Sequence, residues 1–134
     1  MTRFWITLNE GVEFVLSSLG VMHGGEVFVP KIPSMKMTDL AEAMAPGAAI
    51  DVVGIRPGEK LHEIMISADD ARSTADLGDR YAIEPAFVEY PRVPFRLNGG
   101  PCAVPEDFSY ASDTNTDWLS AEALIAMVEE KAAA

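Results

Sequence analysis

The segment Gly54–Glu63, with the sequence GIRPGEKLHE, holds the side chains best suited to binding an anion. The apolar run Ile50–Val53 before it predicts a strand, and the Pro-Gly pair predicts a sharp turn into a helix beginning at Glu59. Arg56 would then emerge at the carboxyl end of a strand, where open α/β sheets bind ligands. Because a guanidinium is a planar fork of donors and stays charged, it suits bidentate recognition of phosphate. The pattern indicates Arg56 as an anion-binding residue.

The same residue types allow a second interpretation. The segment can be an ordinary turn whose Arg56 is solvated or paired with Glu59 or Glu63. Arg3 has a similar alternative, since its stem can pack beside Phe4 while its charge stays in water. Residue types by themselves leave both interpretations open.

Two motifs resemble a known enzyme family. RPGEKLHE (56–63) is similar to a signature in the C-terminal, substrate-binding part of the extended short-chain dehydrogenase/reductases that act as inverting UDP-N-acetylglucosamine 4,6-dehydratases. MTRFWIT (1–7) resembles a second substrate-side motif of the same polysaccharide biosynthesis proteins, and the order and separation of the two motifs agree. The resemblance runs from Met1 to about Tyr81 and resumes at Tyr110–Leu119.

The resemblance implies both a fold and a site. The fold would be mixed α/β, the C-terminal substrate-binding subdomain of such an enzyme without its Rossmann half. A UDP-sugar would be the ligand, with Arg56 on the diphosphate and Arg3 helping it. Glu59 would meet the ribose or the uracil edge, and Met1 and Thr2 would line the pocket.

The chain lacks the parts that catalysis in this family requires. A dinucleotide needs a Gly-x-Gly-x-x-Gly turn, and the base needs a Tyr-x-x-x-Lys pair. The pairs Gly24-Gly25 and Gly99-Gly100 lack that spacing, and no tyrosine is followed four residues later by lysine. We therefore expect no catalytic residue in this chain and no bound cofactor, NADP being held by the missing N-terminal half. The chain is expected to be an inactive fragment or a truncated reading frame of an enzyme that forms a homo-oligomer.

An alternative from another class is a non-catalytic module that binds nucleotide sugars or associates with itself. The face left uncovered by an absent Rossmann half would then mediate the association. Exposed apolar surface distinguishes the two hypotheses, because a fragment should aggregate whereas an evolved module should stay monodisperse.

Amino-acid composition and net charge limit the kinds of ligand that the chain can bind. With 134 residues and 49% hydrophobic content, the chain suits one small domain with its own core. A net charge of −11 argues against nucleic acid, because ten scattered Lys and Arg residues form no stripe along a phosphate backbone. Residues 1–67 carry five basic and eight acidic side chains, whereas 68–134 carry five and thirteen. An anionic ligand is therefore expected in the first half.

The cysteine, the histidines and the hydropathy of the chain argue against an internal disulfide, a metal site and a membrane span. Cys102 has no partner for an internal disulfide and suits a reducing compartment. His23 and His62 do not form an HExxH pair, so no metal site is expected. No apolar run approaches the roughly 18–20 residues of a membrane span. The chain is expected to be cytoplasmic, without a membrane partner.

The elements that must position the site follow from caps, periodicity and turns. Thr7 and Glu10 form a capping box before a predicted helix over 8–19, which stops at Gly20. The spacing of this helix places on one apolar stripe Leu8, Val12, Val15, Leu16 and Leu19. Thr38 is predicted to cap a helix over 39–44. Other predicted elements are strands at 26–30, 34–37 and 49–53, a short capped helix at 67–72, a hairpin pairing 73–75 with 81–83, and a helix after Ser120. Five prolines within 84–105 predict an extended arm. The expected domain organisation is a subdomain over 1–84, the arm over 85–109, and a C-terminal motif and helix over 110–134.

Overall fold

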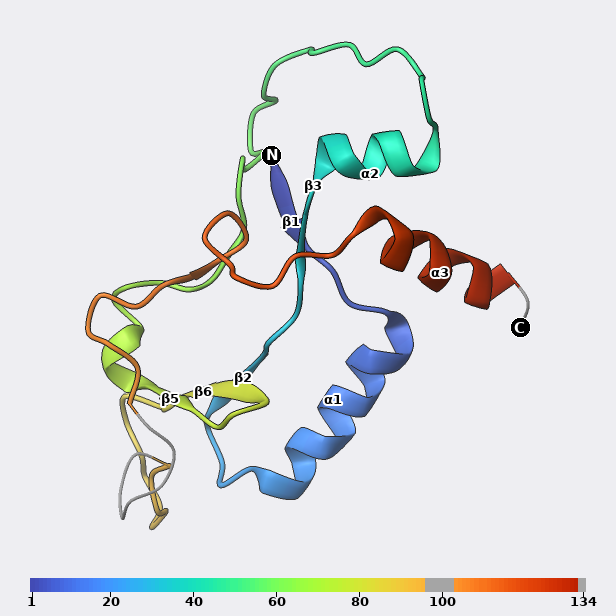
Figure 1. Cartoon of the computed structure of the whole chain (residues 1–134). Helices are drawn as coiled ribbons and strands as arrows, with labels where there is room; N and C mark the ends of the chain where they lie inside the picture. The colour runs from blue at the N-terminus through green and yellow to red at the C-terminus, as the bar shows by residue number, and fades with distance from the viewer. Residues whose placement is uncertain (96–102, 133–134) are drawn as a thin grey trace. The chain divides into compact units, whose positions relative to one another are not determined.

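The computed structural model describes residues 1–95 and 103–132, and side chains as far as Glu129. The helices are α1 (Leu8–Val21), α2 (Met37–Met44), α3 (Ala121–Ala132) and the 3-10 helix η1 (Ala71–Ser73); the strands are β1 (Thr2–Phe4), β2 (Val27–Pro30), β3 (Ser34–Lys36), β4 (Ile64–Ile66), β5 (Thr74–Asp76), β6 (Arg80–Ile83) and β7 (Tyr110–Ala111) (Figure 1). The described strands form the sheets β1-β3, β2-β6-β5 and β4-β7. This mixture of helices and small sheets confirms the expected mixed α/β class. Cys102 and the Gly99-Gly100 pair lie outside the described residues.

The chain divides into two compact units that interleave along the sequence. The first unit consists of Met1–Trp5, Ile32–Glu63 and Ala111–Ala134. The second consists of Ile6–Lys31 and Ile64–Tyr110. Composition predicted contiguous segments with boundaries near residues 84 and 109, whereas the tertiary contacts gather segments that are far apart in sequence.

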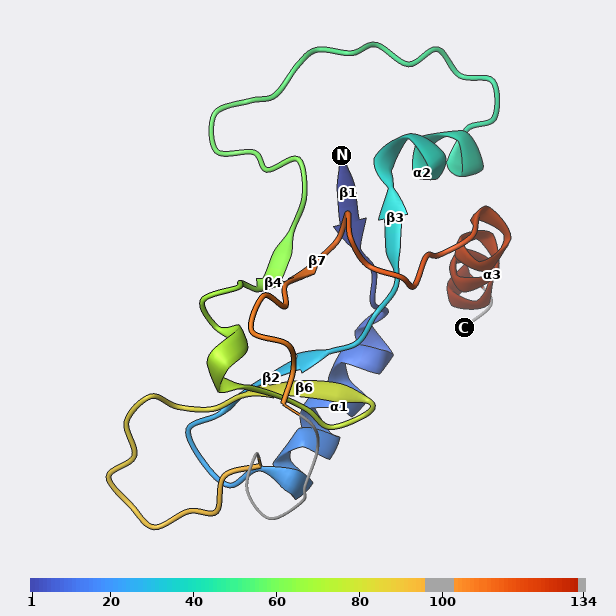
Figure 2. The same ribbon diagram turned by 60° about the vertical axis from the view of Figure 1, so that its left-hand side comes forward.

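The first unit is built on an antiparallel pair of strands with two helices beside it. β1 pairs with β3, and Arg3 lies opposite Met35. Met35 and Leu124 are buried, and α3 packs against α2, as both views show (Figures 1 and 2). Asn115 donates from its amide to the carbonyl of Ile32 at 2.9 Å and to the Ser34 hydroxyl at 3.0 Å. The C-terminal segment is thereby held to the start of β3.

The second unit is built on the three-stranded antiparallel sheet β2-β6-β5. The predicted hairpin is confirmed, since β5 and β6 pair through a turn in which Gly78 has φ 94°. The helix expected over 67–72 is replaced by a turn and the short 3-10 helix η1. In that turn the Asp70 carboxylate accepts a hydrogen bond from the Ser67 hydroxyl. The small side chains of Ala75 and Ala82 are fully buried, which lets other segments lie close to the sheet.

Helix α1 is held to this sheet by its polar face. Arg80 of β6 donates to the hydroxyls of Ser18 at 2.7 Å and Ser17 at 2.9 Å, and its guanidinium lies 4.8 Å from the centroid of the Phe14 ring. The predicted apolar stripe faces solvent instead, and Leu8, Val12, Val15, Leu16 and Leu19 are all exposed. The most hydrophobic face of the helix is therefore uncovered.

The predicted capping box at the start of α1 is confirmed. The Glu10 amide donates to the Thr7 hydroxyl at 3.2 Å, and the Thr7 amide and hydroxyl donate to the Glu10 carboxylate at 2.8 and 2.7 Å. These bonds satisfy N–H groups that have no partner inside the helix. The helix extends to Val21, past the predicted stop at Gly20.

Thr7→Ala is expected to lower the free energy of unfolding by about 0.5–2 kcal/mol, the usual effect of losing an N-cap hydroxyl. The hydrogen bond from the Thr7 side chain lowers the pKa of Glu10 below its ordinary value. This contribution is therefore present above the unfolded-state pKa of Glu10 and is lost as the pH falls through its folded-state pKa. Urea unfolding at neutral and acidic pH should show the difference between Thr7→Ala and wild type shrinking in acid. Thr7→Ser is the control, and equal stability of Thr7→Ala and wild type at neutral pH would contradict the prediction.

Two further predicted elements and one predicted helix cap are wrong. Residues 49–53 form no strand, and Val52 is 93% exposed, because no described segment pairs with them and an isolated strand leaves its backbone groups unpaired. No helix begins at Glu59; the chain turns at Pro57 and continues into β4. Helix α2 starts at Met37 with Lys36 as its N-cap and no side-chain cap, so Thr38 lies inside its first turn.

Candidate functional site

The Arg56–Glu59 turn is closed by two hydrogen bonds. The Glu59 amide donates to the Arg56 carbonyl at 3.0 Å, and the Arg56 amide donates to the Glu59 Oε2 at 2.8 Å. Gly58 has φ 84°, which with Pro57 before it gives the residue pattern of a type II turn. The turn is fixed locally and does not depend on a flanking strand or helix.

The guanidinium of Arg56 is open to solvent. Arg56 is exposed, and no described residue forms a hydrogen bond or ion pair with its side chain. The alternative pairing with Glu59 or Glu63 is not formed, because Glu59 caps the turn and Glu63 pairs with Arg3 at 3.3 Å. The five donors of this cation remain available to a ligand.

Arg3 lies against the segment that follows the turn. Its Nη2 donates to the carbonyl of Lys60 at 2.8 Å, and its Nη1 donates to the carbonyl of Thr2 at 2.7 Å and to that of Leu61 at 3.4 Å. Its Nε lies 3.3 Å from a carboxylate oxygen of Glu63. Arg3 thus uses most of its donors within the protein, and the second hydrogen of Nη2 has no partner among the described residues.

Thr2 joins β1 to two distant segments. Its amide donates to the carbonyl of Leu61 at 2.9 Å. Its hydroxyl lies 2.8 Å from the Nδ1 of His62 and 2.7 Å from the hydroxyl of Ser112. The Glu63 amide donates to the Ser112 hydroxyl at 2.9 Å. Thr2 and Ser112 are buried, so Thr2 supports the segment from within.

All five residues that the sequence predicted for the site belong to the first unit. Arg56 and Glu59 lie in the exposed turn, Arg3 is half-buried next to it, and Thr2 is buried beneath. Met1 is exposed and its carbonyl accepts from the Met37 amide at 3.0 Å.

Sequence reasoning missed how Ser112 takes part in the site, and placed His62 on a helix that does not form. The similarity of Tyr110–Asn115 to a C-terminal family motif was the signal that pointed toward Ser112.

Lys31 and Tyr81 are the pair in the second unit that most resembles a catalytic tyrosine and lysine. Lys31 lies over the face of the Tyr81 ring, with Nζ 4.5 Å from the centroid, and its ammonium pairs with Asp76 at 2.6 Å. Burial, together with the charge of Asp76, raises the pKa of Tyr81. A tyrosine that acts as a base needs a lowered pKa, so this arrangement does not fit that role.

Within residues 1–95 and 103–132, no group of three or more His, Cys, Asp or Glu side chains is placed to hold a metal ion. None of the helices there is both long and apolar enough to cross a membrane.

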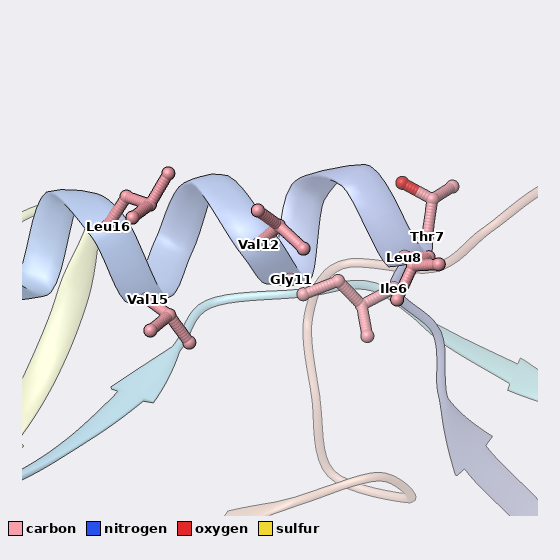
Figure 3. A pocket seen from close by; sticks show the side chains of 7 residues that line it. All are labelled: Ile6, Thr7, Leu8, Gly11, Val12, Val15 and Leu16. Atoms are coloured by element: carbon pink, nitrogen blue, oxygen red, sulfur yellow. The ribbon is translucent and has the colours of Figure 1, made fainter.

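An open apolar groove runs along α1 in the second unit. It has a volume of about 610 Å³ and is lined by Ile6, Thr7, Leu8, Gly11, Val12, Val15 and Leu16 (Figure 3). Figure 3 shows Val12 projecting from one turn of the helix and Val15 and Leu16 from the next. The lining carries no charged side chain, so the groove suits an apolar surface and not a nucleotide.

Comparisons with known proteins agree with the two motifs. Residues 1–85 match the model of a family described as "Polysaccharide biosynthesis protein". Over 133 residues the chain is 50% identical to the UDP-N-acetylglucosamine 4,6-dehydratase (inverting) of Campylobacter jejuni, a match that covers 96% of this chain and 40% of that protein. Over 87 residues it is 34% identical to the UDP-glucose 4-epimerase of Rickettsia bellii, covering 62% of this chain and 26% of that protein.

A solved structure, described as the X-ray structure of Pen from Bacillus thuringiensis, is similar with a TM-score of 0.74 and 25% sequence identity. The similarity covers 98% of this chain and 38% of that chain. The chain thus spans about 40% of the length of the dehydratase that it matches, in the C-terminal part.

Proposed function

Because the chain belongs to the polysaccharide biosynthesis protein family, we propose that it is the UDP-sugar-binding part of a UDP-N-acetylglucosamine 4,6-dehydratase and is inactive by itself. The observation that carries the proposal is the open guanidinium of Arg56 on a turn closed by two hydrogen bonds. A cation held in this way is ready to bind a diphosphate without ordering a loop first.

The names of the relatives support UDP as the recognised group. A UDP-N-acetylglucosamine 4,6-dehydratase and a UDP-glucose 4-epimerase carry out different reactions on different sugars, yet both match this chain. What their named substrates share is the UDP moiety. A segment common to both is therefore best suited to binding that moiety.

Each predicted residue has a role that fits its position. Arg56 would bind the diphosphate, and Arg3 would add its one remaining Nη2 hydrogen. Glu59 would offer Oε1 to the ribose or the uracil, because Oε2 caps the turn. Met1 would line the pocket, while Thr2 would hold the segment from below.

The described residues do not fit the nicotinamide cofactor of such a dehydratase. They include no Gly-x-Gly-x-x-Gly turn between a strand and a helix, and Lys31 covers the face of Tyr81 instead of activating its hydroxyl. NADP would accordingly be bound by the rest of the full-length enzyme. NADP binding, homo-oligomerisation and a cytoplasmic location stay predictions about that enzyme.

Titration of this chain with UDP and with uridine, followed by isothermal calorimetry, tests the proposal. UDP should bind more tightly than uridine, because the diphosphate supplies the charge that Arg56 recognises. Raising the salt concentration should weaken binding of UDP and leave that of uridine nearly unchanged. Equal affinities for UDP and uridine, or no binding of UDP at millimolar concentration, would contradict the proposal.

The exposed apolar face of α1 is expected of a fragment, and it also suits a second candidate, a module that associates with a second copy of itself. In the groove lining, Leu8 is 71% exposed and Leu16 is 63% exposed. Contiguous apolar surface of this kind marks interaction sites. We expect the chain to self-associate, with the groove of one copy covered by that of the other.

A double variant, Val12→Asn with Leu16→Asn, should shift the sedimentation coefficient toward the monomer and reduce binding of a hydrophobic dye. Glu13→Gln is the matched control, since Glu13 is exposed on the same helix but outside the groove lining. A monomeric wild-type chain at all concentrations would rule out this second candidate.

A further inference from the structure

A chain of hydrogen bonds runs from the backbone through two buried hydroxyls to an imidazole. The Glu63 amide lies 2.9 Å from Ser112 Oγ, which lies 2.7 Å from Thr2 Oγ1, which in turn lies 2.8 Å from His62 Nδ1. Thr2 is 5% exposed and Ser112 is fully buried. Water therefore does not replace a missing partner at Ser112.

The direction of this chain follows from counting hydrogens. Each hydroxyl has one hydrogen to donate, and the Glu63 amide is necessarily the donor to Ser112. Ser112 then donates to Thr2, and Thr2 donates to His62 Nδ1. In this direction every hydrogen has an acceptor, provided that Nδ1 of His62 carries no proton. A proton on Nδ1 would make the imidazole a donor to Thr2 and leave one hydroxyl hydrogen, that of Thr2 or of Ser112, without an acceptor among the described residues, at a cost in free energy.

The same chain fixes the backbone that follows the Arg56 turn. Lys60 is held by Arg3, Leu61 by the Thr2 amide, and His62 by the Thr2 hydroxyl. Three successive residues are thus attached to β1, directly after the turn that ends at Glu59. Because the exit of the turn is fixed, the direction in which it presents Arg56 is restricted.

We propose that His62 is a positioning residue for Arg56, acting through a neutral Nδ1 and the hydroxyls of Thr2 and Ser112. The proposal rests on the UDP-binding function above. His62 does not touch the ligand; it holds the segment in the geometry in which Arg56 meets the diphosphate. The tautomer with the hydrogen on Nε2 is part of the proposal.

The tautomer is tested directly by long-range ¹H–¹⁵N NMR of the imidazole nitrogens in this chain, at mildly alkaline pH. His23 provides an internal comparison, because its Nδ1 lies 2.8 Å from the carbonyl of Val93 and must donate to it. The spectrum should show the hydrogen on Nε2 for His62 and on Nδ1 for His23. A hydrogen on Nδ1 of His62 would overturn the proposal.

Variants test the positioning role. His62→Leu removes the acceptor, whereas His62→Asn can place an amide oxygen near the position of Nδ1. We expect His62→Leu to weaken UDP binding roughly 3- to 30-fold, the range for a residue that modulates a site without touching the ligand. His62→Asn should recover most of the affinity. If His62→Asn binds UDP as weakly as His62→Leu, or if both bind like wild type, the positioning role is wrong.

Amide hydrogen exchange separates this proposal from the proposed function. His62→Leu should speed exchange of the Thr2 and Glu63 amides while leaving the amides of the β5-β6 hairpin unchanged. A merely structural effect would speed exchange throughout the chain. If wild type does not bind UDP, the proposed function fails, but the tautomer and the local exchange still decide whether His62 holds the turn. Unchanged exchange at Thr2 and Glu63 would overturn the positioning role even if UDP binds.

Discussion

Arg92→Leu is expected to lower the free energy of unfolding by about 3–5 kcal/mol, because it leaves two buried carboxylates without their cation. Arg92 lies 2.9 Å from a carboxylate oxygen of Glu84 and 3.4 Å from one of Glu26. The side chains of Arg92, Glu26 and Glu84 are 3%, 1% and 11% exposed. These residues fasten the proline-rich segment to the start of β2, where the Phe95 ring also stacks on His23 at a centroid distance of 4.3 Å.

The pH dependence of this cluster has a definite sign. Burial raises the pKa of Glu26. Hydrogen bonds from backbone amides, including that of His23, and the charge of Arg92 lower this pKa by a larger amount, so the net shift is downward. The stabilisation is therefore present above the unfolded-state pKa of Glu26 and is lost as the pH falls through the folded-state value. Wild type should lose stability in acid more steeply than a variant with Glu26→Gln.

Urea unfolding followed by circular dichroism would measure the Arg92 effect. Lys31→Met is the matched control, because Lys31 and Asp76 form a short but partly exposed pair and its loss should cost at most about 1 kcal/mol. The triple variant Arg92→Met, Glu26→Gln and Glu84→Gln removes all three charges and should recover much of the stability. If Arg92→Leu costs no more than Lys31→Met, the cluster does not stabilise the fold.

Arg56→Ala is expected to weaken UDP binding by about 1.5–3 kcal/mol, the range of a hydrogen bond to a charged group, or roughly 10- to 150-fold in Kd. The substitution should change the affinity for UDP and leave the free energy of unfolding unchanged, since no described residue pairs with the Arg56 side chain. Arg56→Lys keeps the charge without the planar fork, so its affinity should be intermediate.

Lys60→Ala is the matched control for Arg56. Lys60 is exposed and basic, and it follows the same turn four residues later. If its loss weakens UDP binding as much as Arg56→Ala, the turn attracts anions by general electrostatics instead of by a specific contact. An unchanged Kd for Arg56→Ala would remove Arg56 from the site.

The parts of the structure that the sequence predicts well depend on neighbours in the chain. The capping box of Thr7 and Glu10 and the hairpin of β5 and β6 form as expected. The Pro-Gly turn after Arg56 forms too, because it is closed by bonds between residues three apart. Local sequence was sufficient to identify Arg56 as a presented cation, although the strand and helix expected around it do not form.

The apolar residues show where pattern fails. Ile50–Val53 has the composition of a strand, but a strand needs a neighbouring backbone, and no described segment provides one. The stripe on α1 has helical spacing, but periodicity does not say what covers it, and Arg80 binds the helix by its other face. Hydrophobic pattern thus determined the secondary structure of α1 but not its burial.

The sequence by itself determined the capping box, the Pro-Gly turn that presents Arg56 and the two family motifs, because caps and turns are set by interactions within about four residues. Only the tertiary structure decided what Arg3, Thr2 and His62 do. Their partners lie far along the chain, with Thr2 bonded to His62 sixty residues away and to Ser112 110 residues away. Such contacts exist only after the chain has closed those loops, so no local pattern of residue types encodes them.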